Sequence, residues 1–289
     1  GDRTVIAPAG QLDETLLAAD LEAQLARRAR FLNSAALPDR LPEDLKAGCI
    51  KALSQLKTQI YTPEGMIRST WSTPDRWPHK NMWLWDSAFH AIGIRHLDLK
   101  LARSLVEAVF DVQREDGYIP HMASPVARSS VTQPPVLGLA IEQLEEVAPD
   151  PAWRTRLIAK LGRYLEWVMA NRDTDGDGLV EWYISAEKHC RCGESGMDNS
   201  PRFDGAIQLD ATDFNAYLAH ECEVMARFQP ERRDFWQGHH RRLCRLINER
   251  LWNEELGIYV DYDTVGRRQT DVMASAGLLP LLCGAPTPA

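Results

Sequence analysis

The sequence predicts an all-α protein in which successive helices form a toroid or solenoid. Apolar residues recur at helical spacing in about nine successive segments, and almost no stretch alternates as a strand does. Polar loops recur between pairs of helices, at residues 79–87, 113–121, 130–135 and 190–204. If alternate helices point the same way, these loops meet at one end of the assembly, where we expect a site.

The first two predicted helices are defined by their apolar stripes and their ends. Residues 11–32 carry leucines close to helical spacing, and Leu37-Pro38-Asp39 breaks that helix. The next helix begins at Pro42-Glu43-Asp44, with proline in its first turn and acids at the positive end of the dipole. An irregular loop rich in Pro, Trp, Ser and Thr follows over residues 61–82.

The remaining elements follow from the same rules. Asp86 or Ser87 can cap a helix that runs through Ile94. Asp210 stands three residues before Asp213, which is close to a capping box for a further helix. The other predicted elements are helices over residues 101–112, 135–144, 153–169, 212–225, 235–251 and 269–282, and a short strand within residues 257–263.

Composition narrows the class of protein. The chain has 289 residues, of which 44% are hydrophobic and 26% charged, enough for one large domain. A net charge of −8 argues against a general nucleic-acid binder. No apolar run reaches the roughly 18 residues that span a bilayer, and the first residues show no basic-then-apolar signal pattern. We therefore expect a soluble, cytoplasmic protein with no nucleic-acid or membrane partner.

Two sequence patterns resemble metal-binding motifs, but the spacing of the residues in each argues against a metal site. His189-Cys190-Arg191-Cys192 has no second Cys/His pair at a metal-finger spacing. Asp173, Asp175 and Asp177 resemble the start of a calcium loop, but the twelfth position is Ile184 rather than an acid. An Asx-rich turn is favoured over calcium, which stays an alternative. We expect no metal and no cofactor.

The most polar loop of the chain runs from Glu194 to Asp204. It combines three carboxylates with an arginine and shows no helical period, and Gly196 and Pro201 break regular structure around Asp198. An ordered polar loop held by a helical scaffold often carries chemistry. The alternative is an acidic surface loop in which Arg202 pairs with Asp204.

Five motifs occur in the same order in a known group of enzymes. The chain resembles the (α/α)6-barrel glycoside hydrolases of the mannosylglycerate hydrolase, processing α-glucosidase and trehalase kind (glycoside hydrolase family 63-like), including the short bacterial members of the mannosylglycerate hydrolase type. The resemblance runs from about residue 40 to 280. The motifs are Trp83 to His90, Gln113 to His121, Thr132-Gln133-Pro134-Pro135, Asp175 to Leu179 and Glu194 to Arg202.

The resemblance implies an inverting hydrolysis of a small α-linked glycoside, such as mannosylglycerate or an α-glucoside. Asp198 matches the general acid of the family. Such an acid protonates the departing oxygen while a carboxylate roughly 6.5–9.5 Å away activates water. To stay protonated near neutral pH it needs a raised pKa, from burial or from negative neighbours such as Glu194 and Asp204.

The resemblance also implies a set of sugar-binding residues. Indole faces stack on sugar rings, and carboxylates accept hydrogen bonds from hydroxyl groups. Tryptophan core packing, a structural histidine and a helix-capping glutamine are the alternatives for the residues concerned. The predicted substrate-binding residues are Trp83, Trp85, Asp86, His121, Gln133 and Arg202.

One departure from the family concerns the general base. The family has a glutamate near the end of the domain, and no motif between residues 205 and 289 matches it. We therefore expect a single barrel domain over residues 1–289 whose C-terminal part is missing. A fragment, a homo-oligomer or completing chain, and a non-catalytic sugar-binding barrel are the alternatives. A sugar isomerase is disfavoured, because such enzymes use a histidine pair and none partners His121.

Overall fold

The structure is a computed structural model that describes residues 19–35, 37–77, 80–186 and 189–286. The chain divides between Thr58 and Gln59 into two compact units, which are described separately. The prediction of one catalytic domain over the whole chain stays a prediction.

The first unit contains two helices, α1 (Leu21–Asn33) and α2 (Glu43–Thr58). The Asp20 side chain accepts a hydrogen bond from the Ala23 backbone N–H at 3.1 Å, which satisfies a first-turn donor of α1. The predicted helix over residues 11–32 extends in part outside the described residues. The second predicted helix is confirmed, with its acids in the first turn.

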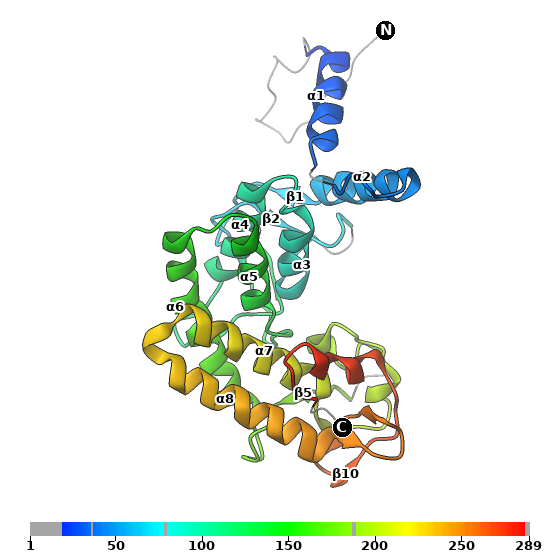
Figure 1. Cartoon of the computed structure of the whole chain (residues 1–289), viewed down its shortest axis with the longest axis vertical. Helices are drawn as coiled ribbons and strands as arrows, with labels where there is room; N and C mark the ends of the chain where they lie inside the picture. Colours follow the sequence, from blue (N-terminus) through cyan, green and yellow to red (C-terminus); the bar gives the residue numbers. More distant parts are fainter. Residues whose placement is uncertain (1–18, 36, 78–79, 187–188, 287–289) are drawn as a thin grey trace. The chain divides into compact units, whose positions relative to one another are not determined.

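The second unit is predominantly helical, as predicted (Figure 1). Helix α7 packs against α5, α6 and α8, and α3 packs against α4 and α5. Buried aliphatic side chains and large aromatic rings fill the space between these helices. The helices are α3 (Leu84–Ile94), α4 (Leu99–Asp111), α5 (Leu137–Val147), α6 (Pro151–Arg172), α7 (Thr212–Phe228) and α8 (Arg233–Leu246), with a π-turn over Ile247–Leu251.

The strands of this unit are two or three residues long and lie in the segments between the helices. The four-stranded antiparallel sheet has the order β10-β9-β6-β5, and three pairs of strands stand apart from it. Among these, β3 pairs with β4, so the segment before α3 lies beside the segment after α4. The strands are β1 (Ile60–Tyr61), β2 (Trp71–Ser72), β3 (Met82–Trp83), β4 (Met122–Ala123), β5 (Glu181–Tyr183), β6 (Gln208–Asp210), β7 (Trp252–Asn253), β8 (Ile258–Tyr259), β9 (Tyr262–Asp263) and β10 (Arg268–Gln269).

Three expected details of these elements are wrong. Helix α3 starts at Leu84, so Asp86 lies in its first turn and is not the cap. Helix α7 starts at Thr212 after Ala211, while Asp210 ends strand β6. The helix predicted over residues 269–282 is not an α-helix: Gln269 ends strand β10, and only Ser275–Leu281 are helical, as the 3-10 helix η6 with Pro280 inside it.

A buried acid on one helix supplies the missing cap of another. Helix α5 has no cap from its own preceding side chain. The Glu221 carboxylate on α7 accepts the N–H groups of Gly138 at 2.6 Å and Leu139 at 2.8 Å instead. A Cβ at Gly138 would lie 2.5 Å from Glu221, so only glycine allows this approach.

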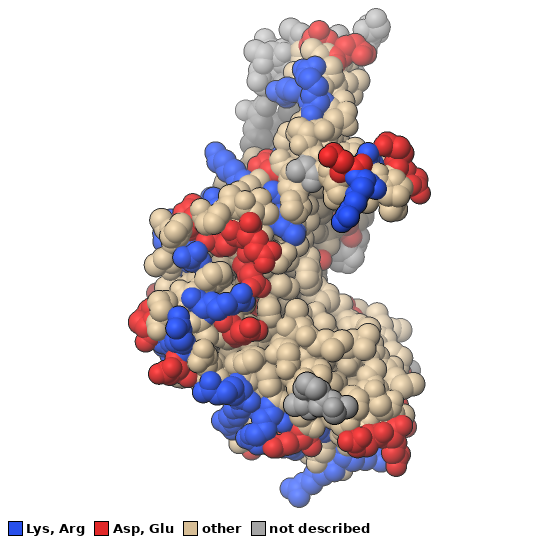
Figure 2. Space-filling view, in the orientation of Figure 1, with Lys and Arg blue, Asp and Glu red and all other residues tan. Residues whose placement is uncertain are grey.

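The surface carries mixed charge on its helical part. Figure 2 shows acidic and basic side chains interspersed over the region of α4, α5 and α6, without a field of one sign. The segment near η6 exposes Met273, Leu278 and Leu281. Among the described residues, no helix is both long enough and apolar enough to cross a membrane.

Candidate active site

Trp83 and His121 are brought together by the pairing of β3 with β4. Trp83 pairs with Met122, and the Leu84 N–H donates to the His121 carbonyl at 2.9 Å. The Trp83 ring meets the His121 ring edge-on, with centroids 5.1 Å apart. His121 Nδ1 is 2.6 Å from Ser129 Oγ, and burial lowers the pKa of His121. The lowered pKa favours the neutral imidazole, in which one ring nitrogen donates and the other accepts a hydrogen bond.

Gln133 links the loop before α5 to the start of α3. Its side-chain Oε1 accepts the backbone N–H of Trp85 at 3.1 Å, and the residue is buried. Trp85 is the second residue of α3, so this amide satisfies a first-turn donor. The alternative of a helix-capping glutamine therefore describes what the side-chain oxygen does. The same bond also fixes the backbone of a predicted sugar-binding residue.

The loop that carries Asp198 lies directly against Trp85. Gly196 adopts a left-handed backbone with φ of 68°, and a Cβ there would lie 2.2 Å from Trp85 Cζ2. Only a residue without a side chain lets the loop approach the indole this closely. The structure thus brings the predicted acid loop and a predicted sugar platform into contact.

Asp198 and Asp86 are electrostatic neighbours. Burial raises the pKa of Asp198, against opposing hydrogen bonds from its own backbone N–H and from Cys190. Burial also raises the pKa of Asp86 to about 6, and the charge on Asp198 adds to that rise. A raised pKa of this origin is what a general acid needs.

Glu194 does not supply the negative neighbour that was expected for Asp198. Its carboxylate is buried and accepts the N–H groups of Tyr183 at 2.8 Å and Thr132 at 3.3 Å. It also forms an ion pair with Arg172, the last residue of α6. Burial, rather than this acid, is the main cause of the raised pKa of Asp198.

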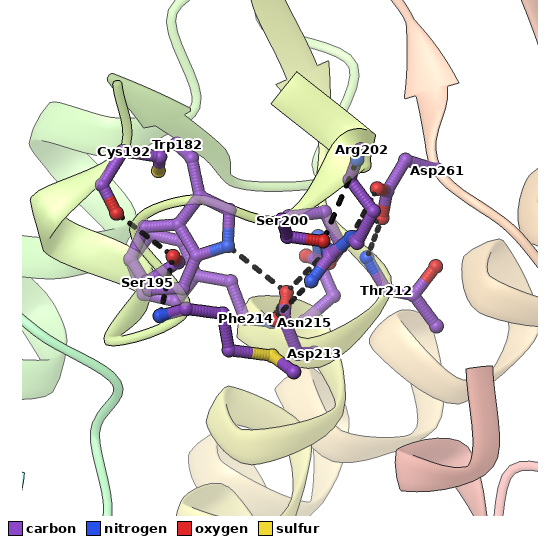
Figure 3. Close-up of polar contacts among 12 residues, drawn as sticks. Trp182, Cys192, Ser195, Ser200, Arg202, Thr212, Asp213, Phe214, Asn215 and Asp261 are labelled. Atoms are coloured by element: carbon purple, nitrogen blue, oxygen red, sulfur yellow. Dashed lines mark hydrogen bonds and ion pairs between the residues drawn. The ribbon is translucent and has the colours of Figure 1, made fainter. Parts of the chain in front are cut away.

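Arg202 lies in a buried cage of two carboxylates (Figure 3). Its Nη1 and Nη2 donate to Asp213 at 2.6 and 2.9 Å, and its Nε and Nη2 donate to Asp261 at 2.7 and 2.8 Å. Burial raises the pKa of Asp213, but the guanidinium overrides this and holds the pKa below its usual value. The alternative pairing of Arg202 with Asp204 does not occur. The guanidinium nitrogens of Arg202 already donate to these two carboxylates. The assignment of Arg202 as a sugar ligand therefore stays a prediction, which this geometry does not support.

Neighbouring groups hold this cage in place. Trp182 Nε1 donates to Asp213 at 2.9 Å, and the Trp182 ring stacks on Phe214 with centroids 3.9 Å apart (Figure 3). The Thr212 N–H donates to Asp261 at 2.9 Å. The cage thereby ties the end of the acid loop to the first turn of α7 and to the segment between β8 and β9.

Sequence reasoning missed Asp213, Asp261, Arg172 and Arg191 as supports of this loop. Arg191 donates to the carbonyl groups of Phe203, Asp204 and Ala206, the last at 2.9 Å. The available signal was Arg202, an arginine with acids nearby in the sequence. Its partner Asp261, however, lies 59 residues away along the chain. No local pattern identifies such a partner.

One acidic group could hold a cation. The carboxylates of Asp173, Asp175 and Asp177 come within 4.8 Å of one another, and they are the only such group among the described His, Cys, Asp and Glu residues. Asp175 accepts the Asp177 N–H at 3.2 Å and Asp177 accepts the Leu179 N–H at 2.8 Å, which is the expected Asx-rich turn. Arg250 forms an ion pair with Asp177 and neutralises part of the charge.

Comparisons with known proteins place the chain in a family. Residues 79–289 match the model of the mannosylglycerate hydrolase MGH1-like glycoside hydrolase domain. The chain belongs to this glycoside hydrolase family. The match spans α3 to η6 and therefore includes all the predicted site residues.

Two curated relatives are similar in sequence to part of this chain. The mannosylglycerate hydrolase MGH1 of Selaginella moellendorffii is 27% identical over 190 residues, which cover 57% of this chain and 38% of that protein. The glucosylglycerate hydrolase of Mycolicibacterium hassiacum is 30% identical over 171 residues, which cover 47% of this chain and 36% of that protein. The chain thus spans under two fifths of the length of these two curated relatives.

A solved structure shares the fold. The crystal structure of a GH63 mannosylglycerate hydrolase from Thermus thermophilus in complex with glucose superposes with a TM-score of 0.70 at 24% identity. The superposition covers 82% of this chain and 72% of that one. At this identity the likeness shows a shared fold and leaves the reaction to be argued from the site.

Proposed function

We propose that this chain carries the acid and much of the sugar-binding site of an inverting glycoside hydrolase. Its substrate is a small α-linked glycoside, such as mannosylglycerate or an α-glucoside. The observation that carries the proposal is the position of Asp198, a carboxyl group with a pKa raised by burial on a loop that contacts Trp85. Family membership and the names of the relatives support the class of substrate.

The helices of the second unit are proposed to belong to an (α/α)6 barrel. The TM-score of 0.70 against the Thermus enzyme supports this, and so does one of 0.60 against the neutral trehalase Nth1 of Saccharomyces cerevisiae. In such a barrel the loops that carry Trp83, His121, Gln133 and Asp198 share one mouth. The contacts between these loops in the described residues agree with that arrangement.

In the proposed mechanism, protonated Asp198 donates its proton to the glycosidic oxygen as the bond to the sugar breaks. A second carboxylate on the opposite face removes a proton from the attacking water, which inverts the anomeric configuration. Asp86, once ionised, accepts hydrogen bonds from sugar hydroxyls, and the indoles of Trp83 and Trp85 cover the ring. We assign no residue of this chain to the general base.

The test is Asp198→Asn in the full-length protein, with Asp204→Asn as the matched control, because Asp204 lies exposed on the same loop. Turnover of mannosylglycerate, glucosylglycerate and trehalose is measured by sugar release. We expect Asp198→Asn to lose about 10²–10⁴-fold in kcat, the usual worth of general acid assistance. The control keeps its rate.

Two further measurements separate this proposal from its rival, a barrel that binds sugar without cleaving it. NMR of the first product shows which anomer forms, and a retained anomer contradicts inversion. Calorimetry reports binding independently of turnover. Tight binding by a wild type that cleaves none of the three glycosides would establish the binding-only alternative, and full activity of Asp198→Asn would refute the assigned acid.

A further inference from the structure

We infer that Glu194 is the positioning residue that sets where Asp198 stands relative to the sugar-binding residues. The inference rests on the proposed function, because it concerns the acid of that reaction. Glu194 is 1% exposed and lies in the 3-10 turn Gly193–Ser195, a few residues before Asp198. Its side chain faces the protein interior, so it acts through the backbone of its own loop.

Three separate elements converge on the Glu194 carboxylate. Oε2 accepts the N–H of Tyr183 at the end of β5, at 2.8 Å, and Oε1 accepts the N–H of Thr132 at 3.3 Å. Arg172 at the end of α6 forms an ion pair with Oε1. A carboxylate this buried is stable only with such partners, so the turn is confined to the place where all three can reach it.

The contact with Thr132 extends to the sugar-binding residues. Thr132 is itself fixed, since its Oγ1 donates to the Ile119 carbonyl at 2.8 Å. The next residue, Gln133, holds the Trp85 backbone N–H. Glu194 therefore joins the acid loop to the loop that orients Trp85, in addition to the direct contact at Gly196.

The Glu194→Gln variant keeps the volume of the side chain and removes its charge. A glutamine offers one acceptor oxygen where the carboxylate offers two, so it can accept from Thr132 or from Tyr183 but not from both. Its NH₂ group then faces a backbone donor, and Arg172 loses its ion pair with the carboxylate. We expect the turn to shift while the helices keep their packing.

Glu145 provides a matched control. It is also a buried glutamate that accepts a backbone N–H, from Asp150 at 2.8 Å, and pairs with an arginine, Arg154, at 2.6 Å. It lies near the C-terminal end of α5, away from the acid loop. Glu145→Gln therefore removes a similar buried charge without touching the loop of Asp198.

The decisive measurement compares two leaving groups in the full-length protein. A glycerate glycoside needs a proton on its leaving oxygen, whereas the fluoride of the same sugar leaves with little help from an acid. If Glu194 positions Asp198, Glu194→Gln lowers kcat on the glycoside by about 100-fold and on the fluoride by less than about fivefold, with KM changed by less than about threefold. Glu145→Gln changes neither rate selectively. An equal loss on both substrates would mean a merely structural role and would overturn the inference.

Hydrogen exchange tests the geometry without any turnover. We expect Glu194→Gln to speed exchange of the Thr132 and Tyr183 amides and of the turn that follows residue 193, and to leave helix α4 unchanged. Unchanged exchange at those amides would overturn the inference even in an active enzyme. If the wild type cleaves neither substrate, the proposed function fails, and the exchange result still decides whether Glu194 holds the loop.

Discussion

Replacing Glu221 by glutamine should change the pH dependence of stability in a calculable way. The Glu221 carboxyl is fully buried on α7 and accepts two first-turn N–H groups of α5, from Gly138 and Leu139. Burial raises its pKa from 4.5 to about 7, in spite of the nearby His220 and the two N–H donors. The folded protein therefore holds this proton more tightly than the unfolded chain does.

The magnitude follows from the difference between the two pKa values. A group whose pKa is higher in the folded state adds stability below its unfolded pKa and loses that contribution as pH rises through its folded pKa. Between pH 5 and pH 8, a shift from 4.5 to about 7 corresponds to a loss of about 2.5 kcal/mol in the free energy of unfolding. Glutamine does not ionise, so Glu221→Gln lacks this loss. It instead loses one acceptor, at about 1 kcal/mol, at every pH.

Urea unfolding at pH 5, 6, 7 and 8 measures this directly. The wild type should exceed Glu221→Gln in stability most at pH 5, and its advantage should shrink by about 2.5 kcal/mol by pH 8. Glu223→Gln, an exposed site on the same helix, serves as the control and should track the wild type. Parallel curves for the wild type and Glu221→Gln would refute the reasoning, because they would mean that the two states bind this proton equally.

Three more predictions concern the site. Gly196→Ala should displace the Trp85 indole, because its Cβ would lie 2.2 Å from the ring, and should weaken sugar binding by about tenfold in calorimetry. The left-handed backbone at this position should also lower the stability of the variant by about 1–3 kcal/mol. Unchanged affinity would mean that Trp85 does not bind the sugar. Since burial raises the pKa of Asp86 to about 6, sugar affinity should fall by about tenfold from pH 7 to pH 5 as its carboxylate is protonated, and a flat profile would contradict its role as an acceptor. Arg202→Met should cost about 3–5 kcal/mol in urea unfolding, because it leaves two buried carboxylates unpaired, and a loss below about 1 kcal/mol would show that water reaches them.

Periodic and local signals carried the prediction of the helices. The apolar stripes of α4, α6 and α7 repeat over many residues, so a few mismatches do not hide them. The ends of the helices were harder to predict. Asp86 and Asp210 are good cap residues by type, but Asp86 lies inside the first turn of α3 and Asp210 ends strand β6. Helix α5 receives its cap from Glu221 on another helix. Tertiary contacts of this kind outweigh local preference.

The candidate site divides in the same way. Trp83, Trp85 and Asp86 lie close together because they are close in sequence, and their residue types indicated sugar binding. Glu194 was named with Asp204 as a negative neighbour that could raise the pKa of Asp198, yet its partners are Thr132, Tyr183 and Arg172.

The sequence by itself determined most of the helical segments of the second unit, which loops carry polar side chains and which family the motifs resemble, since each of these depends on residues close together in the chain. Tertiary structure decided the partners of the buried charges. Arg202 meets Asp261 across 59 residues and Thr132 meets Glu194 across 62. The physical reason is that a buried charge must find a counter-charge or a donor wherever packing places one, and packing depends on the whole chain.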